Sequence, residues 1–300
     1  MTNEYADIKL LTEIPIDEKF VFDKFVRQKR IELISSPKET AKKATQNNQQ
    51  QVIQLLNENK ISETIILLRE LAYQEFLKEE ALFNGEILKS LGEKFKTPKE
   101  IIEKISNHLF DLNINNQKDF RENLLQTIGH YTAGISPYIY ALCLSNTQSR
   151  RSRAGKVFEG IIYFLYDYFK YPFDAQSKIG KQSFSSLGLG KIVDSILPGV
   201  LQFNERRDKT IVGTMKTTLR ERWQEVVEEV TRSNVPRIYL LTVDDDFSEN
   251  KIQQMSNHNI ILVVTKNIKQ TELMKNKRSV IDFETYFCEE IPEIMSFWEK

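Results

Sequence analysis

Four ionisable side chains in the second half of the chain have types and spacings that suit hydrolysis of a phosphodiester bond. Asp194 lies in an apolar run that predicts a strand, and Lys216 ends the next such run, 22 residues later. Glu229 follows after a further 13 residues in a predicted helix, and Glu159 precedes Asp194 in another predicted helix. An aspartate within a buried strand is costly unless it is paired or binds a cation, so Asp194 is expected to have a partner.

Two interpretations of this partner are open from the residues alone. Two or three carboxylates provide the oxygen ligands that Mg²⁺ prefers. The metal would polarise a phosphoryl oxygen and lower the pKa of its water, while Lys216 would orient that water and stabilise the developing charge. Alternatively, Lys216 forms a structural ion pair with one of the carboxylates.

A short charged triplet stands where the next predicted helix begins, and it consists of Arg220, Glu221 and Arg222. A helix N-terminus can enter the major groove of DNA end-on, where arginine pairs with guanine O6 and N7 and glutamate accepts from the cytosine amino group. The triplet therefore predicts a reader of a CC:GG step, although the same residues also suit an ordinary solvated helix face.

One known family has the same order of residues that this chain has at Asp194, Lys216, Arg220–Arg222 and Glu229. The pattern resembles the type II restriction endonucleases that recognise CCGG or CCNGG, which are the EcoRII, PspGI, NgoMIV and BsaWI group of the PD-(D/E)XK nucleases. In this group the second acid has moved from two residues before the lysine, which is Thr214 here, to the following helix. The resemblance covers about residues 150–232.

This resemblance implies a role for each residue of the pattern. Asp194 and Glu229 would be ligands of Mg²⁺, Lys216 would be the catalytic lysine, and Glu159 would support the site. Arg220, Glu221 and Arg222 would read the CC:GG step. The implied activity is Mg²⁺-dependent cleavage of double-stranded DNA at a palindrome with CC and GG half-sites, before the first C. A palindrome cut by two active sites implies a homodimer or a higher homo-oligomer.

Apolar runs and capping signals predict the elements that position these residues. We expect strands over residues 191–197, 210–216, 237–243, 259–264 and 280–283, and helices over 154–170 and 219–231. This order predicts an α/β, restriction-endonuclease-like core with a central mixed β-sheet flanked by helices. Earlier residues predict an all-helical N-terminal region, with helices opened by Ser36, Ser62 and Thr97 and a loop over 146–153.

The chain is accordingly expected to contain two domains. Residues 1–135 would form a helical domain that makes DNA and dimer contacts, and residues 136–300 would form the PD-(D/E)XK catalytic domain. Two other nuclease-related functions remain alternatives to the restriction enzyme. These are a structure- or damage-directed nuclease of the same fold and a non-catalytic DNA-binding regulator.

Charge is balanced over the whole chain but not along it. Residues 150–222 contain 14 Lys and Arg against 7 Asp and Glu, whereas the rest contains 28 against 35. The basic stretch predicts phosphate contacts, for which Arg150, Arg151 and Arg153 are weak candidates, although an exposed loop would explain them equally well. Asp244–Asp246 is expected to be a solvated turn, with a metal site as the alternative.

Composition excludes several classes of protein. No apolar run approaches the roughly 18 residues that a membrane span needs, so no membrane partner is expected. The N-terminus shows no secretory signal, and the two cysteines do not provide a disulfide framework or a zinc site. These features predict a cytoplasmic protein.

Overall fold

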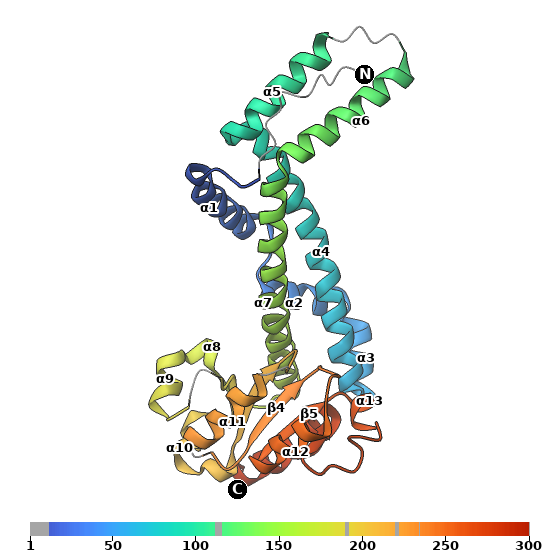
Figure 1. Ribbon diagram of the computed structural model, residues 1–300. Coiled ribbons are helices and arrows are strands. Elements are labelled where there is room, and N and C mark those ends of the chain that lie inside the picture. Colours follow the sequence, from blue (N-terminus) through green and yellow to red (C-terminus); the bar gives the residue numbers. More distant parts are fainter. Residues whose placement is uncertain (1–11, 112–115, 190–191, 220–221, 234, 300) are drawn as a thin grey trace. The chain divides into compact units, whose positions relative to one another are not determined.

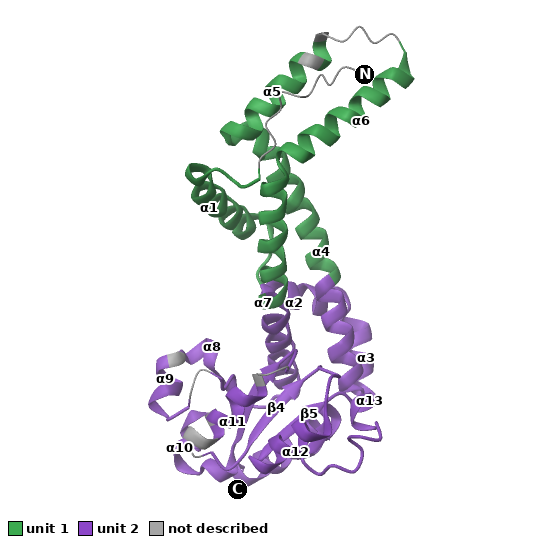
Figure 2. Ribbon diagram, in the orientation of Figure 1, with its two compact units in different colours: residues 1–36, 74–152 green, residues 37–73, 153–300 purple. Residues whose placement is uncertain are grey.

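The computed structural model describes residues 12–111, 116–189, 192–219, 222–233 and 235–299. The chain forms two compact units, each built from two segments (Figure 2). The first contains Met1–Ser36 and Gln74–Ser152, and the second contains Pro37–Tyr73 and Arg153–Lys300. Two long helices, α4 (Ile61–Lys94) and α7 (Ser136–Tyr168), each contribute residues to both units.

The second unit is organised around a six-stranded mixed sheet with the strand order β1-β2-β3-β4-β5-β6. Its central strands β4 and β5 are labelled in Figure 1. The strands are β1 (Asp174–Ala175), β2 (Ser195–Leu197), β3 (Ile211–Lys216), β4 (Ile238–Thr242), β5 (Ile260–Val264) and β6 (Val280–Asp282). Strands β1, β2 and β3 pair antiparallel, and β3 to β6 pair parallel. The sheet confirms the predicted mixed α/β core.

Helices connect and cover these strands. In chain order they are α2 (Pro37–Asn47), α3 (Gln49–Asn57), α8 (Gln176–Ile179), α9 (Lys181–Ser186), α10 (Val200–Glu205), the 3₁₀ helix η1 (Arg207–Lys209), α11 (Arg222–Ser233), α12 (Glu249–Asn257), α13 (Lys266–Lys269), α14 (Phe283–Thr285), the π-helix η2 (Tyr286–Glu290) and α15 (Ile291–Trp298), together with parts of α4 and α7.

Side chains that point alternately to the two faces of the sheet are apolar on both faces. On β3 and β4, Met215 and Tyr239 belong to a cluster with apolar side chains of α4, α7 and α15. Val212 and Leu240 belong to a second cluster with side chains of α9 to α12. Successive strand residues point to opposite faces, and burial on both faces explains why β3 and β4 are nearly continuous apolar runs.

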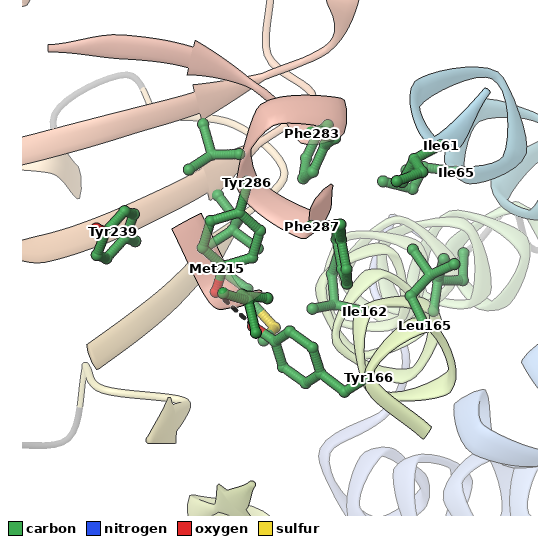
Figure 3. Packing of buried hydrophobic residues seen from close by; sticks show 14 of the residues in the cluster. Ile61, Ile65, Ile162, Leu165, Tyr166, Met215, Tyr239, Phe283, Tyr286 and Phe287 are labelled. Carbon is green, nitrogen blue, oxygen red and sulfur yellow. Dashed lines mark hydrogen bonds between the residues drawn. The ribbon is translucent and has the colours of Figure 1, made fainter. Parts of the chain in front are cut away.

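The first of these clusters also contains a buried polar contact (Figure 3). The hydroxyls of Tyr166 on α7 and Tyr286 on η2 lie 2.8 Å apart and form a hydrogen bond. Burial raises the pKa of Tyr166 to about 12, so both hydroxyls remain protonated at neutral pH. Helix α7 is thereby tied to the C-terminal segment through packing and one satisfied pair of hydroxyls.

The first unit is helical in all regular elements of its described residues. It contains α1 (Ile16–Leu33), α5 (Lys96–Asp111), α6 (Gln117–Gly134) and the remaining parts of α4 and α7. Its core includes Phe22, Phe83, Phe95 and Tyr138. The predicted helical N-terminal region is confirmed. The compact units do not coincide with the ranges 1–135 and 136–300, because residues 37–73 belong to the unit of the sheet and residues 136–152 to the helical unit.

The loop predicted over residues 146–153 is wrong, because these residues lie inside α7. The segment contains neither glycine nor proline, so nothing in it interrupts a helix. Its polar side chains also find partners within the first unit. Asn146 donates to Asn84 Oδ1 at 2.8 Å and accepts from Arg30 at 2.7 Å.

Two of the three predicted capping residues have another role. Ser36 directly precedes α2 as expected, but Ser62 and Thr97 are the second residues of α4 and α5. The amide and hydroxyl of Ser62 donate to Glu284 at 2.9 and 2.6 Å, and those of Thr97 lie 3.4 and 3.2 Å from Glu18 Oε1. Carboxylates distant in sequence therefore satisfy these helix starts.

No described helix is long and apolar enough to span a membrane.

Candidate active site

Asp194 and Lys216 meet where two neighbouring strands of the sheet adjoin. Strand β2 begins at Ser195 rather than at residue 191, so Asp194 directly precedes it. Its amide nevertheless donates to Gly213 O at 2.9 Å, and its carbonyl accepts from Gln176 N at 3.0 Å. Because β2 and β3 are antiparallel and Ser195 pairs with Gly213, the residue that precedes β2 lies beside the C-terminal half of β3. Lys216 Nζ lies 3.6 Å from Asp194 Oδ2.

The surroundings of the Asp194 carboxylate are largely closed to solvent. The side chains of Asp194 and Lys216 are 14% and 15% exposed. Met215 N donates to Asp194 Oδ2 at 2.7 Å, and Thr214 Oγ1 lies 3.4 Å from the same oxygen. Burial raises the pKa of Asp194 to about 6, Lys216 opposes this shift, and the charge of Glu159 adds to it. The carboxylate is therefore short of compensating positive charge.

Helix α7 brings two side chains to Asp194, one helical turn apart. Glu159 is 17% exposed, and its Oε2 lies 3.1 Å from Lys156 Nζ. Tyr163 donates its hydroxyl to the carbonyl oxygen of Asp194 at 3.0 Å. Residues four apart share a helix face, which explains why one helix provides both groups. The ring of Tyr163 packs against the first apolar cluster, and its hydroxyl holds the Asp194 backbone.

The remaining predicted site residues lie on or before α11. Glu229 and Arg222 belong to this helix, but the structure does not describe their side chains. Arg220 and Glu221 lie outside the described residues. The roles of these four residues therefore stay predictions. Leu219, the last described residue before the triplet, is fully buried.

The three arginines predicted to contact phosphate lie on α7 rather than in a loop. Arg150 donates from Nε and Nη2 to Glu80 within the first unit. Arg153 donates to Thr40 Oγ1 at 2.9 Å within the second unit, and Arg151 is exposed. The contacts of Arg150 and Arg153 are with protein groups, and phosphate binding by the three residues stays a prediction.

The chemistry of the Asp194 site fits a hard divalent cation. All described hydrogen-bond and ion-pair contacts to this carboxylate fall on Oδ2, which leaves Oδ1 available as a ligand. Because burial and the charge of Glu159 disfavour the ionised form of Asp194, a bound cation would stabilise it. Among the described side chains, no three His, Cys, Asp or Glu residues gather as a metal cluster. Glu229 is not among those side chains.

Two comparisons with characterised proteins bear on this arrangement. A family model described as EcoRII C terminal matches residues 117–287. The type II restriction enzyme SsoII of Shigella sonnei is 46% identical over 160 residues, which are 52% of this chain and 51% of that protein. The chain thus matches about half the length of this curated relative.

Solved structures extend the similarity over most of the fold. Metal-depleted Ecl18kI in complex with uncleaved, modified DNA has a TM-score of 0.72 and 30% identity, covering 93% of this chain and 85% of that one. The complex of the restriction endonuclease PspGI with substrate DNA has a TM-score of 0.59 and 16% identity, covering 88% and 94%.

These similarities confirm the expected restriction-endonuclease-like fold and the resemblance to the EcoRII and PspGI group. The family match spans more than half of the chain and includes Glu159, Asp194, Lys216 and Glu229. By its sequence, the chain belongs to the EcoRII C-terminal family.

Proposed function

We propose that the chain is a Mg²⁺-dependent type II restriction endonuclease that cuts double-stranded DNA at a palindrome with CC and GG half-sites, of the CCGG or CCNGG type. The observation that carries this proposal is the position of Lys216 Nζ, 3.6 Å from a mostly buried Asp194 carboxylate, in a chain of the EcoRII C-terminal family. SsoII is a type II restriction enzyme, and the Ecl18kI and PspGI structures are DNA complexes, which supports double-stranded DNA as the substrate.

The catalytic roles follow from the residues around Asp194. Asp194 and Glu229 would hold Mg²⁺, which when bound polarises a phosphoryl oxygen and lowers the pKa of water. Lys216 would orient the attacking water and stabilise charge at phosphorus, because its ammonium is held in a largely closed site. Glu159 would add negative charge at the same site. Water attacks in line, and the products carry 5′-phosphate and 3′-hydroxyl ends.

Recognition is assigned to the segment from the end of β3 to the first residue of α11. Arg220 and Arg222 would pair with guanines, and Glu221 would accept from cytosine amino groups in the major groove. Since the segment begins directly after Lys216, recognition and catalysis would use adjacent residues of one chain. A palindromic site would be cut by a homodimer or a higher homo-oligomer, before the first C of each strand. The enzyme would act in the cytoplasm.

Sequencing the ends of a digest tests this function. The full chain is incubated with plasmid DNA and Mg²⁺, and the fragment ends are sequenced. We expect every end to derive from one palindrome with CC and GG half-sites, and no cleavage when EDTA replaces Mg²⁺. Ends without a common sequence would instead indicate a structure- or damage-directed nuclease. Retention of specific DNA without cutting would indicate a DNA-binding regulator.

A further inference from the structure

The first residue of the acidic run Asp244–Asp246 contacts the segment that follows Lys216. Asp244 Oδ2 accepts a hydrogen bond from Leu219 N at 2.6 Å. A carboxylate that accepts from a backbone amide forms a charge-assisted bond, which is stronger than a neutral one. The sequence predicted a solvated turn over Asp244–Asp246. Asp244 instead binds the backbone of Leu219.

The topology of the sheet explains why these two residues meet. Strands β3 and β4 are parallel, and their last residues, Lys216 and Thr242, are paired. The segments that follow them therefore leave the same edge of the sheet. Leu219 comes three residues after Lys216, and Asp244 comes two residues after Thr242. The contact therefore joins the segments that follow β3 and β4, at the end of the sheet where Lys216 lies.

Asp244 is itself held in place by local contacts. Its amide donates to Thr242 Oγ1 at 3.1 Å, and the residue Thr242 is fully buried. Asp244 is partly buried, whereas Asp245 and Asp246 are exposed. The three neighbouring carboxylates therefore differ in environment, although the sequence gives them the same charge. Asp245 supplies a matched control for any effect of removing charge at this edge.

The amide that Asp244 binds belongs to the residue immediately before the triplet. Leu219 is buried in the second apolar cluster, so its side chain and its backbone are both anchored. Arg220 is the next residue in the chain, and Arg222 begins α11. Discrimination between bases depends on bidentate geometry, and a misplacement of about 1 Å can cost on the order of 100-fold in rate.

We propose that Asp244 is a positioning residue for DNA-sequence recognition, acting through its bond to Leu219 N on the segment that carries Arg220, Glu221 and Arg222. The inference rests on the proposed function, since it assumes that these three residues read the DNA. Asp244 does not contact the substrate. Its carboxylate holds the backbone at Leu219, the residue before the triplet, and its removal affects selectivity before it affects the fold.

The test compares cleavage of two DNA duplexes by the full-length protein. One duplex carries the site found by end sequencing, and the other carries that site with one CC:GG base pair replaced. Single-turnover rates are measured for wild type, Asp244→Ala and Asp245→Ala. For Asp244→Ala we expect the ratio of the two rates to fall about tenfold, and for Asp245→Ala to change by less than about twofold. Partial unfolding lowers both rates equally and leaves the ratio unchanged.

A conservative variant keeps the test decisive. Asp244→Asn retains an oxygen that can accept from Leu219 N, and we expect it to restore most of the ratio. An unchanged ratio in Asp244→Ala, or an equal fall in Asp245→Ala, overturns the inference. If Asp244→Ala does not fold, Asp244→Asn decides alone: its neutral oxygen makes a weaker bond to Leu219 N, so we expect a ratio about twofold below wild type, and a ratio equal to that of wild type and Asp245→Asn overturns the inference. Wild-type protein that cuts both duplexes equally would contradict the proposed function itself.

Discussion

Two carboxylate–cation pairs of the chain differ in how completely the cation satisfies the carboxylate. In the first unit, Arg150, which is 46% exposed, donates from two nitrogens to both oxygens of Glu80, whose side chain is only 2% exposed. In the second unit, Lys216 makes one contact of 3.6 Å with Asp194 Oδ2, and both side chains are about equally shielded at 15% and 14% exposure. The first pair is closed, and the second is open to a further ligand.

This difference indicates that the Lys216–Asp194 pair is suited to catalysis and that the Arg150–Glu80 pair has a structural role. A planar guanidinium matches a carboxylate bidentately, so Glu80 needs no other cation. The ammonium of Lys216 is a point charge that leaves Asp194 Oδ1 without a described contact, and burial still raises the pKa of Asp194 to about 6. Unsatisfied charge in a shielded place is typical of functional sites, whereas a buried carboxylate that a bidentate partner satisfies is typical of structural ones.

The largest expected effect on stability comes from opening the closed pair. Arg150→Ala leaves the Glu80 carboxylate buried without its guanidinium, so we expect a loss of about 3 kcal/mol in the free energy of unfolding. Chemical denaturation measures this loss. The neighbouring exposed Arg151→Ala is the control, with an expected change below about 0.5 kcal/mol. Equal effects of the two substitutions would show that the Arg150–Glu80 pair has no special structural role.

Removing the charge of Asp194 from the open pair is expected to raise the free energy of unfolding, whereas opening the closed pair lowers it. The folded state raises the pKa of Asp194 from 3.8 to about 6, so ionised Asp194 destabilises the metal-free protein above pH 6. Asp194→Asn should therefore raise the free energy of unfolding by about 2 kcal/mol near pH 7.5. The gain should shrink as the pH falls from 6 to 4, because the wild-type carboxyl is then protonated in the folded protein.

Denaturation of wild type and Asp194→Asn in EDTA at several pH values measures this difference. Asp245→Asn is the control, because it removes one exposed carboxylate, and we expect no comparable pH-dependent gain from it. A loss of stability in Asp194→Asn near pH 7.5 would mean that Lys216 satisfies Asp194 as fully as Arg150 satisfies Glu80.

The smallest expected effect concerns the support of the open pair. Tyr163→Phe removes the hydroxyl that donates to Asp194 O, which is worth about 1 kcal/mol, or roughly a fivefold fall in cleavage rate. Tyr168→Phe on the same helix is the control, because its hydroxyl contacts Asn57 at 3.3 Å in an exposed position. Single-turnover cleavage by both variants makes the comparison. Equal rates for the two variants would leave Tyr163 as a core residue only.

Much of the sheet could be predicted because its central strands are buried on both faces. The apolar runs that form β3, β4 and β5 mark these strands to within two residues. The two-residue strand β1 has no such signal, since it exists only through pairing with β2. The polar composition of residues 146–153 suits an exposed helix as well as a loop. The absence of glycine and proline permits the helix, and the partners of Asn146 stabilise it.

The candidate site also contains residues that could be predicted from the sequence and contacts that could not. Spacing and resemblance placed Asp194 and Lys216 in one site, and the structure brings the two side chains together. The contacts of Tyr163 and Asp244 could not be predicted, because both side chains bind backbone groups, and backbone groups leave no mark in the sequence. Their partners are set by strand register and by the approach of α7, which are tertiary features.

The central claim is that the open pair at Lys216 performs DNA cleavage. The most direct measurement is the single-turnover rate with Mg²⁺ on a duplex carrying the CC and GG palindrome, for Lys216→Ala and for Lys275→Ala as a matched control. Lys275 is an exposed lysine paired with Glu272. We predict that Lys216→Ala cuts on the order of 1,000-fold more slowly than wild type while folding normally, and that Lys275→Ala cuts within about twofold of it. Cleavage by Lys216→Ala at the wild-type rate would contradict the account.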